Sequence, residues 1–179
     1  PASLAADRTI TLPDASVTLA SGTMLATDGD GSSLSGVGKI GQCIQVFKSD
    51  VTSTTSGSFV AITGITLSIT PSATSSKILI IPDLYVSTTS DVVCDAQLFR
   101  DTTIIGGDDV NNVFQMMGDT LSWNTGKFHC NFIDSPSTTS ATTYLVKWLV
   151  GSGTLYLNRA GGGTNVSGSS TLTLMEILA

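Results

Sequence analysis

The sequence predicts an all-β protein whose main domain is an antiparallel, jelly-roll-like β-sandwich. Serine and threonine make up about 50 of the 179 residues; threonine favours strands and serine favours turns. Glutamate occurs once and lysine five times, so the residues that favour exposed helix positions are nearly absent. Apolar residues recur in runs of strand length between turn-forming residues, as in sandwiches and barrels. We therefore expect no helix longer than about two turns.

Residues 1–36 differ from the rest and are expected to form an N-terminal attachment or shaft segment. Residues 9–12 alternate in polarity, Pro13-Asp14 indicates a turn, and residues 16–19 form a second short run. Two such short strands cannot bury a core by themselves, so the segment needs a neighbour, such as the same segment of sister chains. The Gly/Asp/Ser-rich loop at 28–33 marks the boundary.

Residues 37–179 are expected to form the sandwich, a C-terminal knob domain. Its predicted strands span 39–47, 59–70, 77–86, 92–99, 112–117, 126–133, 142–150, 154–157 and 170–178. Turn-rich stretches separate them, among them 52–57, 72–76, 135–137 and 161–163.

Strand alternation predicts which faces are buried. Ile65, Leu67 and Ile69 share one face of their strand, whereas 77–81 and 144–150 are apolar on both faces. A strand that is apolar on both sides must be covered on both sides, and a subunit interface is one way to do this. Together with the low charge content, this favours a symmetric assembly, which we expect to be a homotrimer.

The composition argues against several classes of partner and cofactor. The net charge is −6, so we expect neither nucleic-acid binding nor membrane insertion, and the apolar runs are far shorter than a membrane span. Gly36, Gly38 and Gly41 match the spacing of a dinucleotide-binding loop, but a Ser/Gly loop precedes them and a β pattern follows. Asp28 and Asp30 lack the further ligands of a calcium loop. We expect no cofactor.

We also expect no enzymatic activity and no catalytic residues. His129 is the only histidine, and its strand parity places it opposite Phe128, Cys130 and Phe132. No G-x-S-x-G motif is present for a serine nucleophile. A pair among the thirteen aspartates could still cleave glycosides, which remains an alternative.

The three cysteines, Cys43, Cys94 and Cys130, cannot all pair within one chain and form no C-x-x-C motif. We expect them to be reduced, mostly buried and free of metal, as in a protein that folds in a reducing cytoplasm.

Two groups of residues are candidates for a binding or structural role. Trp123 and Asn124 lie beside a turn, where an indole ring and a side-chain amide suit a sugar ligand. Glu176 shares a strand face with Leu172 and Leu174, and a carboxylate there needs a partner. We expect a structural ion pair between Glu176 and either Arg100 or Arg159, within a subunit or across the trimer interface.

Six segments of the chain carry a resemblance to a known family: residues 7–19 (DRTITLPDASVTL), 77–80 (KILI), 97–101 (QLFRD), 134–144 (DSPSTTSATTY), 155–159 (LYLNR) and 170–177 (STLTLMEI). They resemble segments of tail-fibre-type and other virion structural proteins of tailed bacteriophages, particularly marine and cyanobacterial ones. The resemblance implies a homotrimeric fibre or knob with an intertwined or attaching N-terminal segment and a C-terminal β-sandwich, and no catalytic residues.

On this basis we expect a virion fibre or spike component, assembled in the bacterial host cytoplasm, that displays its sandwich for host attachment. Its partners would be its own copies, other virion proteins through the N-terminal segment, and a host surface glycan or protein. Alternatives are a capsid or neck decoration protein without receptor binding, a glycan-degrading tailspike fragment, and a bacterial carbohydrate-binding module.

Overall fold

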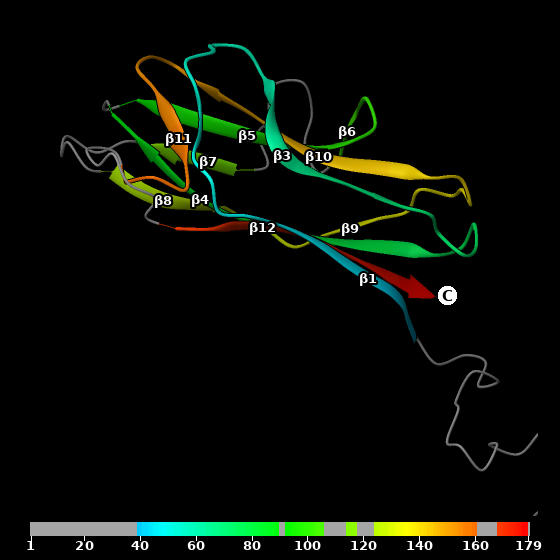
Figure 1. Ribbon diagram of the computed structural model, residues 1–179. Coiled ribbons are helices and arrows are strands. Elements are labelled where there is room, and N and C mark those ends of the chain that lie inside the picture. Colours follow the sequence, from blue (N-terminus) through cyan, green and yellow to red (C-terminus); the bar gives the residue numbers. More distant parts are fainter. Residues whose placement is uncertain (1–38, 90–91, 106–113, 118–123, 161–167, 179) are drawn as a thin grey trace, which may run out of the picture. The chain divides into compact units, whose positions relative to one another are not determined.

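Figure 1 shows the computed structural model of the protein, which describes residues 39–89, 92–105, 114–117, 124–160 and 168–178. The predicted segment 1–36 lies outside the described residues. Within them every regular element is a strand, as predicted. The strands are β1 (Lys39–Lys48), β2 (Thr52–Thr54), β3 (Val60–Ile69), β4 (Lys77–Thr88), β5 (Val93–Arg100), β6 (Thr103–Ile105), β7 (Phe114–Met117), β8 (Asn124–His129), β9 (Phe132–Asp134), β10 (Thr142–Val150), β11 (Leu155–Leu157) and β12 (Ser170–Leu178).

The first sheet is built around β4, the longest strand. Along one edge of β4, its first half pairs with β12 and its last residues pair with β11. Along the other edge, the first half pairs with β9 and the second half with β8. Beyond β12 lies β1, and beyond β11 lies β2. The seven strands therefore make four rows.

The second sheet contains β3, β10 and β5 in that order, and the outer edge of β5 pairs with both β6 and β7. It therefore also has four rows. All pairings in both sheets are antiparallel, and the sheets lie face to face in Figure 1.

The order of the rows defines a jelly roll. Numbered along the chain, the rows of the first sheet lie in the order 1-8-3-6, and those of the second lie in the order 2-7-4-5. This arrangement follows from an antiparallel chain that wraps between two sheets, as in jelly rolls. The predicted fold class is confirmed for the described residues.

The core fills the space between the sheets, and strand alternation creates it. In β10 every second residue is buried, from Thr142 to Val150, because side chains of a strand point alternately to its two faces. The largest fully buried side chains are Trp148, Tyr144 and Phe128. Trp148 is thus a core residue.

The two ends of the sandwich differ. At one end, which we call the terminal end, Lys39 of β1 pairs with Leu178 of β12, so the chain enters and leaves the domain together there. The connections 70–76, 101–102 and 135–141 lie at the same end. At the opposite or distal end lie the connections 49–51 and 151–154, which follow β1 and β10.

Two local predictions were wrong, and one strand was not predicted. Residues 52–57 were expected to be a turn, but Thr52–Thr54 forms β2 by pairing with β11. The hairpin strand β6 was not predicted; it follows a tight turn at Asp101, whose φ is 51°. The strand expected at 126–133 is broken after His129 into β8 and β9.

Candidate interaction surfaces

The structure describes only part of the predicted sugar-binding pair. Trp123 lies outside the described residues. Asn124 is the first residue of β8 and pairs with Thr88 at the distal end. The sugar-binding role of both residues stays a prediction.

The predicted ion pair of Glu176 is wrong, although its burial was predicted correctly. Glu176 is fully buried, and its carboxylate accepts hydrogen bonds from Ser72 and Gln42 rather than from an arginine. Arg100 instead contacts Asp134, and the guanidinium of Arg159 lies 4.1 Å from the centre of the Tyr156 ring. Neutral donors from the loop 70–76 and from β1 therefore replace the expected cation.

The Glu176 site joins three segments at the terminal end. Its Oε1 accepts hydrogen bonds of 2.6 Å from both the backbone N–H and the hydroxyl of Ser72, and its Oε2 accepts one of 2.8 Å from the Gln42 amide. The same amide donates to the Thr70 carbonyl at 2.7 Å. Burial raises the pKa of Glu176, but the hydrogen bonds from Ser72, Ser76 and Gln42 outweigh it, so the net shift is downward.

A bulge in β1 makes this site possible. The register of β1 against β12 shifts between Ile40 and Cys43, which places Gly41 and Gln42 against Glu176. A Cβ on Gly41 would lie 2.9 Å from the Oε2 of Glu176. Glycine at position 41 therefore leaves room for the carboxylate. We call Gln42, Ser72 and Glu176 the carboxylate lock.

A second buried cluster connects the two sheets. The Arg100 Nη1 lies 2.9 Å from both carboxylate oxygens of Asp134, and the Tyr144 hydroxyl donates to the same carboxylate at 2.7 Å. Asp134 belongs to the first sheet, whereas Arg100 and Tyr144 belong to the second. Burial and the neighbouring carboxylate raise the pKa of Tyr144, so the phenol stays a donor. We call this cluster the inter-sheet clip.

His129 and the cysteines lie mostly as their strand parity predicts. His129 is exposed, while the preceding residue, Phe128, is buried. All three cysteines are free thiols; Cys94 is buried and Cys130 is half-buried. Burial raises the pKa of each of these two thiols to about 11. Cys43 is exposed, which contradicts the expected burial, because it lies on the outer face of the edge strand β1.

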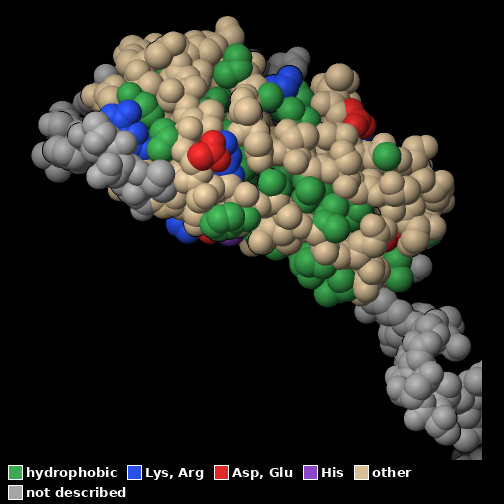
Figure 2. Space-filling view, viewed as in Figure 1, with side chains coloured by type: hydrophobic (Ala, Val, Ile, Leu, Met, Phe, Trp, Pro, Cys, Tyr) green, Lys and Arg blue, Asp and Glu red, His purple; other side chains and the backbone are tan. Residues whose placement is uncertain are grey.

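The outer face of the first sheet is apolar near the terminal end. A row of paired residues runs across four strands, from Cys43 through Met175 and Leu79 to Ile133. Ile40 and Ile133 are 61% and 54% exposed. In Figure 2, hydrophobic side chains gather along β1 toward this end. We call the apolar part of this surface the apolar half-face; it consists of Ile40, Cys43, Leu79, Ile81, Ile133, Met175 and Ile177. Lys77, Gln45 and Thr173 lie in the same rows and form its polar rim.

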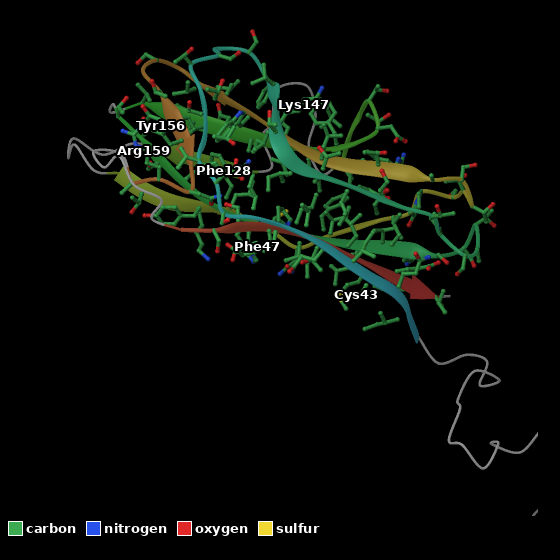
Figure 3. All side chains as sticks on the ribbon, viewed as in Figure 1. Cys43, Phe47, Phe128, Lys147, Tyr156 and Arg159 are labelled. Carbon is green, nitrogen blue, oxygen red and sulfur yellow. The ribbon has the colours of Figure 1, made fainter. Side chains whose placement is uncertain are left out.

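The same outer face is polar and aromatic near the distal end. Lys127 lies 2.9 Å from the carboxylate of Asp83, and His129 pairs with Asp83 across the strands. Figure 3 shows Tyr156 and Arg159 together near the distal end, far from Cys43. We call this surface the polar half-face; it consists of Asp83, Tyr85, Thr125, Lys127, His129 and Tyr156.

Neither a metal site nor a membrane-spanning helix is found in the part of the chain that the structure describes. Among those residues, His, Cys, Asp and Glu side chains do not gather into groups of three or more that could hold a metal ion. The same residues include no helix with the length and hydropathy of a membrane crossing.

Comparison with known proteins gives only distant similarities. No family model matches the chain, and no curated protein does. Among solved structures, the chain is similar to a chain in the structure of the infectious bursal disease virus Gt strain, with a TM-score of 0.42 and 14% identity over 77% of this chain and 38% of that one. It is also similar to a chain in the structure of the VP2 subviral particle of that virus, with a TM-score of 0.39 and 18% identity over 77% of this chain and 38% of that one. The chain thus spans less than half the length of those chains. Its own strand order establishes the jelly roll.

Proposed function

We propose that this protein is a structural, non-enzymatic component of a tailed-bacteriophage virion, a fibre or spike subunit that presents its jelly roll for host attachment. The observation that carries the proposal is the division of the domain into two ends. The chain enters and leaves at the terminal end, beside the apolar half-face, whereas the polar half-face lies toward the distal end. Such a domain is suited to attachment to the virion at its terminal end and to contact with a host at its distal end.

The proposal also rests on the six segments that resemble phage tail-fibre-type proteins, and on the chemistry of the surface. Ser and Thr hydroxyls supply much of the polar surface, and tyrosine rings with neighbouring arginine and lysine suit contacts with sugars or proteins. The jelly roll itself is used both in viral capsids and in lectins. In this proposal the N-terminal segment attaches the subunit to other virion proteins, the subunits form a homotrimer, and the host partner is a surface glycan or protein.

Adsorption competition tests the proposal. Host cells are incubated with the purified full chain and then with the phage that encodes it, and unadsorbed phage is counted over time. We expect slower adsorption that recovers when the protein is washed away. An unrelated β-sandwich protein of similar charge is the control.

Cryo-electron microscopy of the same virion locates the protein. Density for the jelly roll on a tail fibre or spike supports the proposal. Density on the head or neck, together with unchanged adsorption, would favour a decoration protein without receptor binding. Cleavage of host glycans by the purified chain would favour the tailspike alternative.

A further inference from the structure

The apolar half-face is a sheet surface whose opposite side is already filled by the core. Ile78 and Ile80 point inward and are fully buried, while Leu79 between them points outward beside Met175 and Ile133. Among the residues that the structure describes, the outward side chains are shielded by their neighbours on the same face. A strand that is apolar on both faces belongs in a structure that covers both faces.

The apolar half-face is the centre of a larger surface. Strands lie about 4.8 Å apart and same-face residues about 6.8 Å apart, so its seven residues cover roughly 230 Å², and the three rows with their polar members cover roughly 400 Å². Neighbouring surface would complete the roughly 800 Å² that each partner of a stable complex buries.

The β1 edge of the sheet is protected against the addition of a strand, which favours a contact through the face. A bulge interrupts β1 between Ile40 and Cys43, and Lys48 at the end of the strand turns inward, where it pairs with Asp50 at 2.6 Å. Bulges and inward-pointing charges both block the addition of a further strand to an edge.

Charge selects the partner. The chain carries a net charge of −6, so copies repel one another over most of their surface. The apolar half-face includes no carboxylate: Glu176 on the same strand as Met175 turns inward, and Asp83 lies in the polar half-face with Lys127. The charged residue at its rim is Lys77, which is exposed and pairs with Ile177. A surface without carboxylates contacts an identical surface without the repulsion between carboxylates, whereas an anionic membrane would require a cluster of basic residues.

We propose that copies of this chain pack against one another through the apolar half-face. The inference deepens the proposed function, because it assigns the assembly surface of the proposed trimer. Residues near a symmetry axis meet their own counterparts, and Cys43 lies in the central row of the surface.

Sedimentation equilibrium of the full chain at micromolar concentration tests the surface. We expect wild-type protein to be oligomeric and Ile133→Glu to raise the dissociation constant by at least about 100-fold, because an unpaired carboxylate would be buried. Ile40→Glu, on the opposite side of the surface, should act in the same way. Both residues are more than half exposed, so neither change disturbs the core.

Phe47→Glu is the matched control. Phe47 is 63% exposed and lies on the same strand and the same outer face as Ile40. It belongs to the row that contains Thr171, Asp83 and His129, which lies outside the apolar half-face. This variant should assemble like wild type. Circular dichroism confirms that each variant keeps its β structure.

Alkylation of Cys43 supplies a measurement that needs no variant. Mass spectrometry of tryptic peptides should show Cys43 protected from maleimide in concentrated wild-type protein and modified on dilution. Four results would each overturn the proposed assembly surface. They are a monomeric wild type, unchanged assembly of both Ile133→Glu and Ile40→Glu, dissociation of Phe47→Glu equal to that of these variants, and a Cys43 that is not protected in concentrated protein. Adsorption competition and particle location are separate measurements, so the proposed host-attachment function would stand or fall independently.

Discussion

The hydroxyl of Tyr144 in β10 donates a 2.7 Å hydrogen bond to the carboxylate of Asp134 in β9, and so joins the two sheets through their buried interior. Arg100 completes the clip from the second sheet. A cluster in which every buried polar group has a partner fixes the relative position of the sheets, and its removal leaves charges without partners.

The inter-sheet clip should therefore contribute measurably to stability. Tyr144→Phe removes one donor from a buried carboxylate and should lower the free energy of unfolding by about 1 to 2 kcal/mol. Urea denaturation followed by tryptophan fluorescence measures this. Tyr156→Phe is the control, because the Tyr156 ring lies half-buried on the outer face beside Arg159. Equal losses in the two variants would contradict the role of the clip.

The carboxylate lock predicts a specific pH dependence. The pKa of Glu176 is lowered from its ordinary value of 4.5 in the folded protein, so the folded state binds this proton more weakly than the unfolded state. The resulting stabilisation is fully present above the unfolded pKa and is lost as the pH falls through the lower, folded pKa. Glu176→Gln should remove it, and should also place an amide donor opposite the donors of Ser72 and Gln42. The difference between the urea midpoints of wild type and Glu176→Gln should therefore decrease as the pH falls below 4.5. A constant difference would argue against the lock.

Gly41, the one glycine of β1, should be difficult to replace for steric reasons. A Cβ at this position would lie 2.9 Å from both the Oε2 of Glu176 and a methyl carbon of Leu178. We expect Gly41→Ala to lower the free energy of unfolding by about 1 to 3 kcal/mol, since overpacking forces neighbours to move. Gly57→Ala is the control, because its nearest atom would be 4.0 Å away. Thermal denaturation of the two variants compares them, and an equal effect would contradict the steric cause.

The three thiols should differ in reactivity. In the Ile133→Glu variant, in which we expect separate copies, Cys43 should react with a thiol reagent much faster than Cys94 and Cys130. The thiolate is the reactive form, and burial raises the pKa of these two thiols to about 11. Titration in denaturant without reductant should count three thiols. A count of one would reveal a disulfide and would undermine assembly in a reducing compartment.

Much of the fold could be predicted because long strands show a clear alternation of apolar and polar residues in the sequence. Residues 142–150 and 170–178 were predicted with the bounds that the structure has. Three-residue strands such as β2 and β6 give no periodic signal, since pairing with a neighbour rather than their own sequence makes them strands.

The interior polar sites could be predicted only in part. Alternation placed Glu176 on the buried face but could not name its donors, because they come from a loop and a bulge that are distant in sequence. The predicted strand 126–133 ends one residue before Asp134, which belongs to β9. Its parity with Phe128, Cys130 and Phe132 was the available signal that it points inward.

The antiparallel pairing of the first and last strands has a mechanical consequence. If the terminal end is tethered to a particle and the distal end to a host, tension runs parallel to β1 and β12, whose ladder extends from Lys39 opposite Leu178 to Lys48 opposite Ser170. Hydrogen bonds in such a ladder lie perpendicular to the strands. The force is therefore a shear that acts on the hydrogen bonds of the ladder together rather than one at a time. The hydrogen bond between Gln42 and Glu176 lies near the terminal end of this ladder.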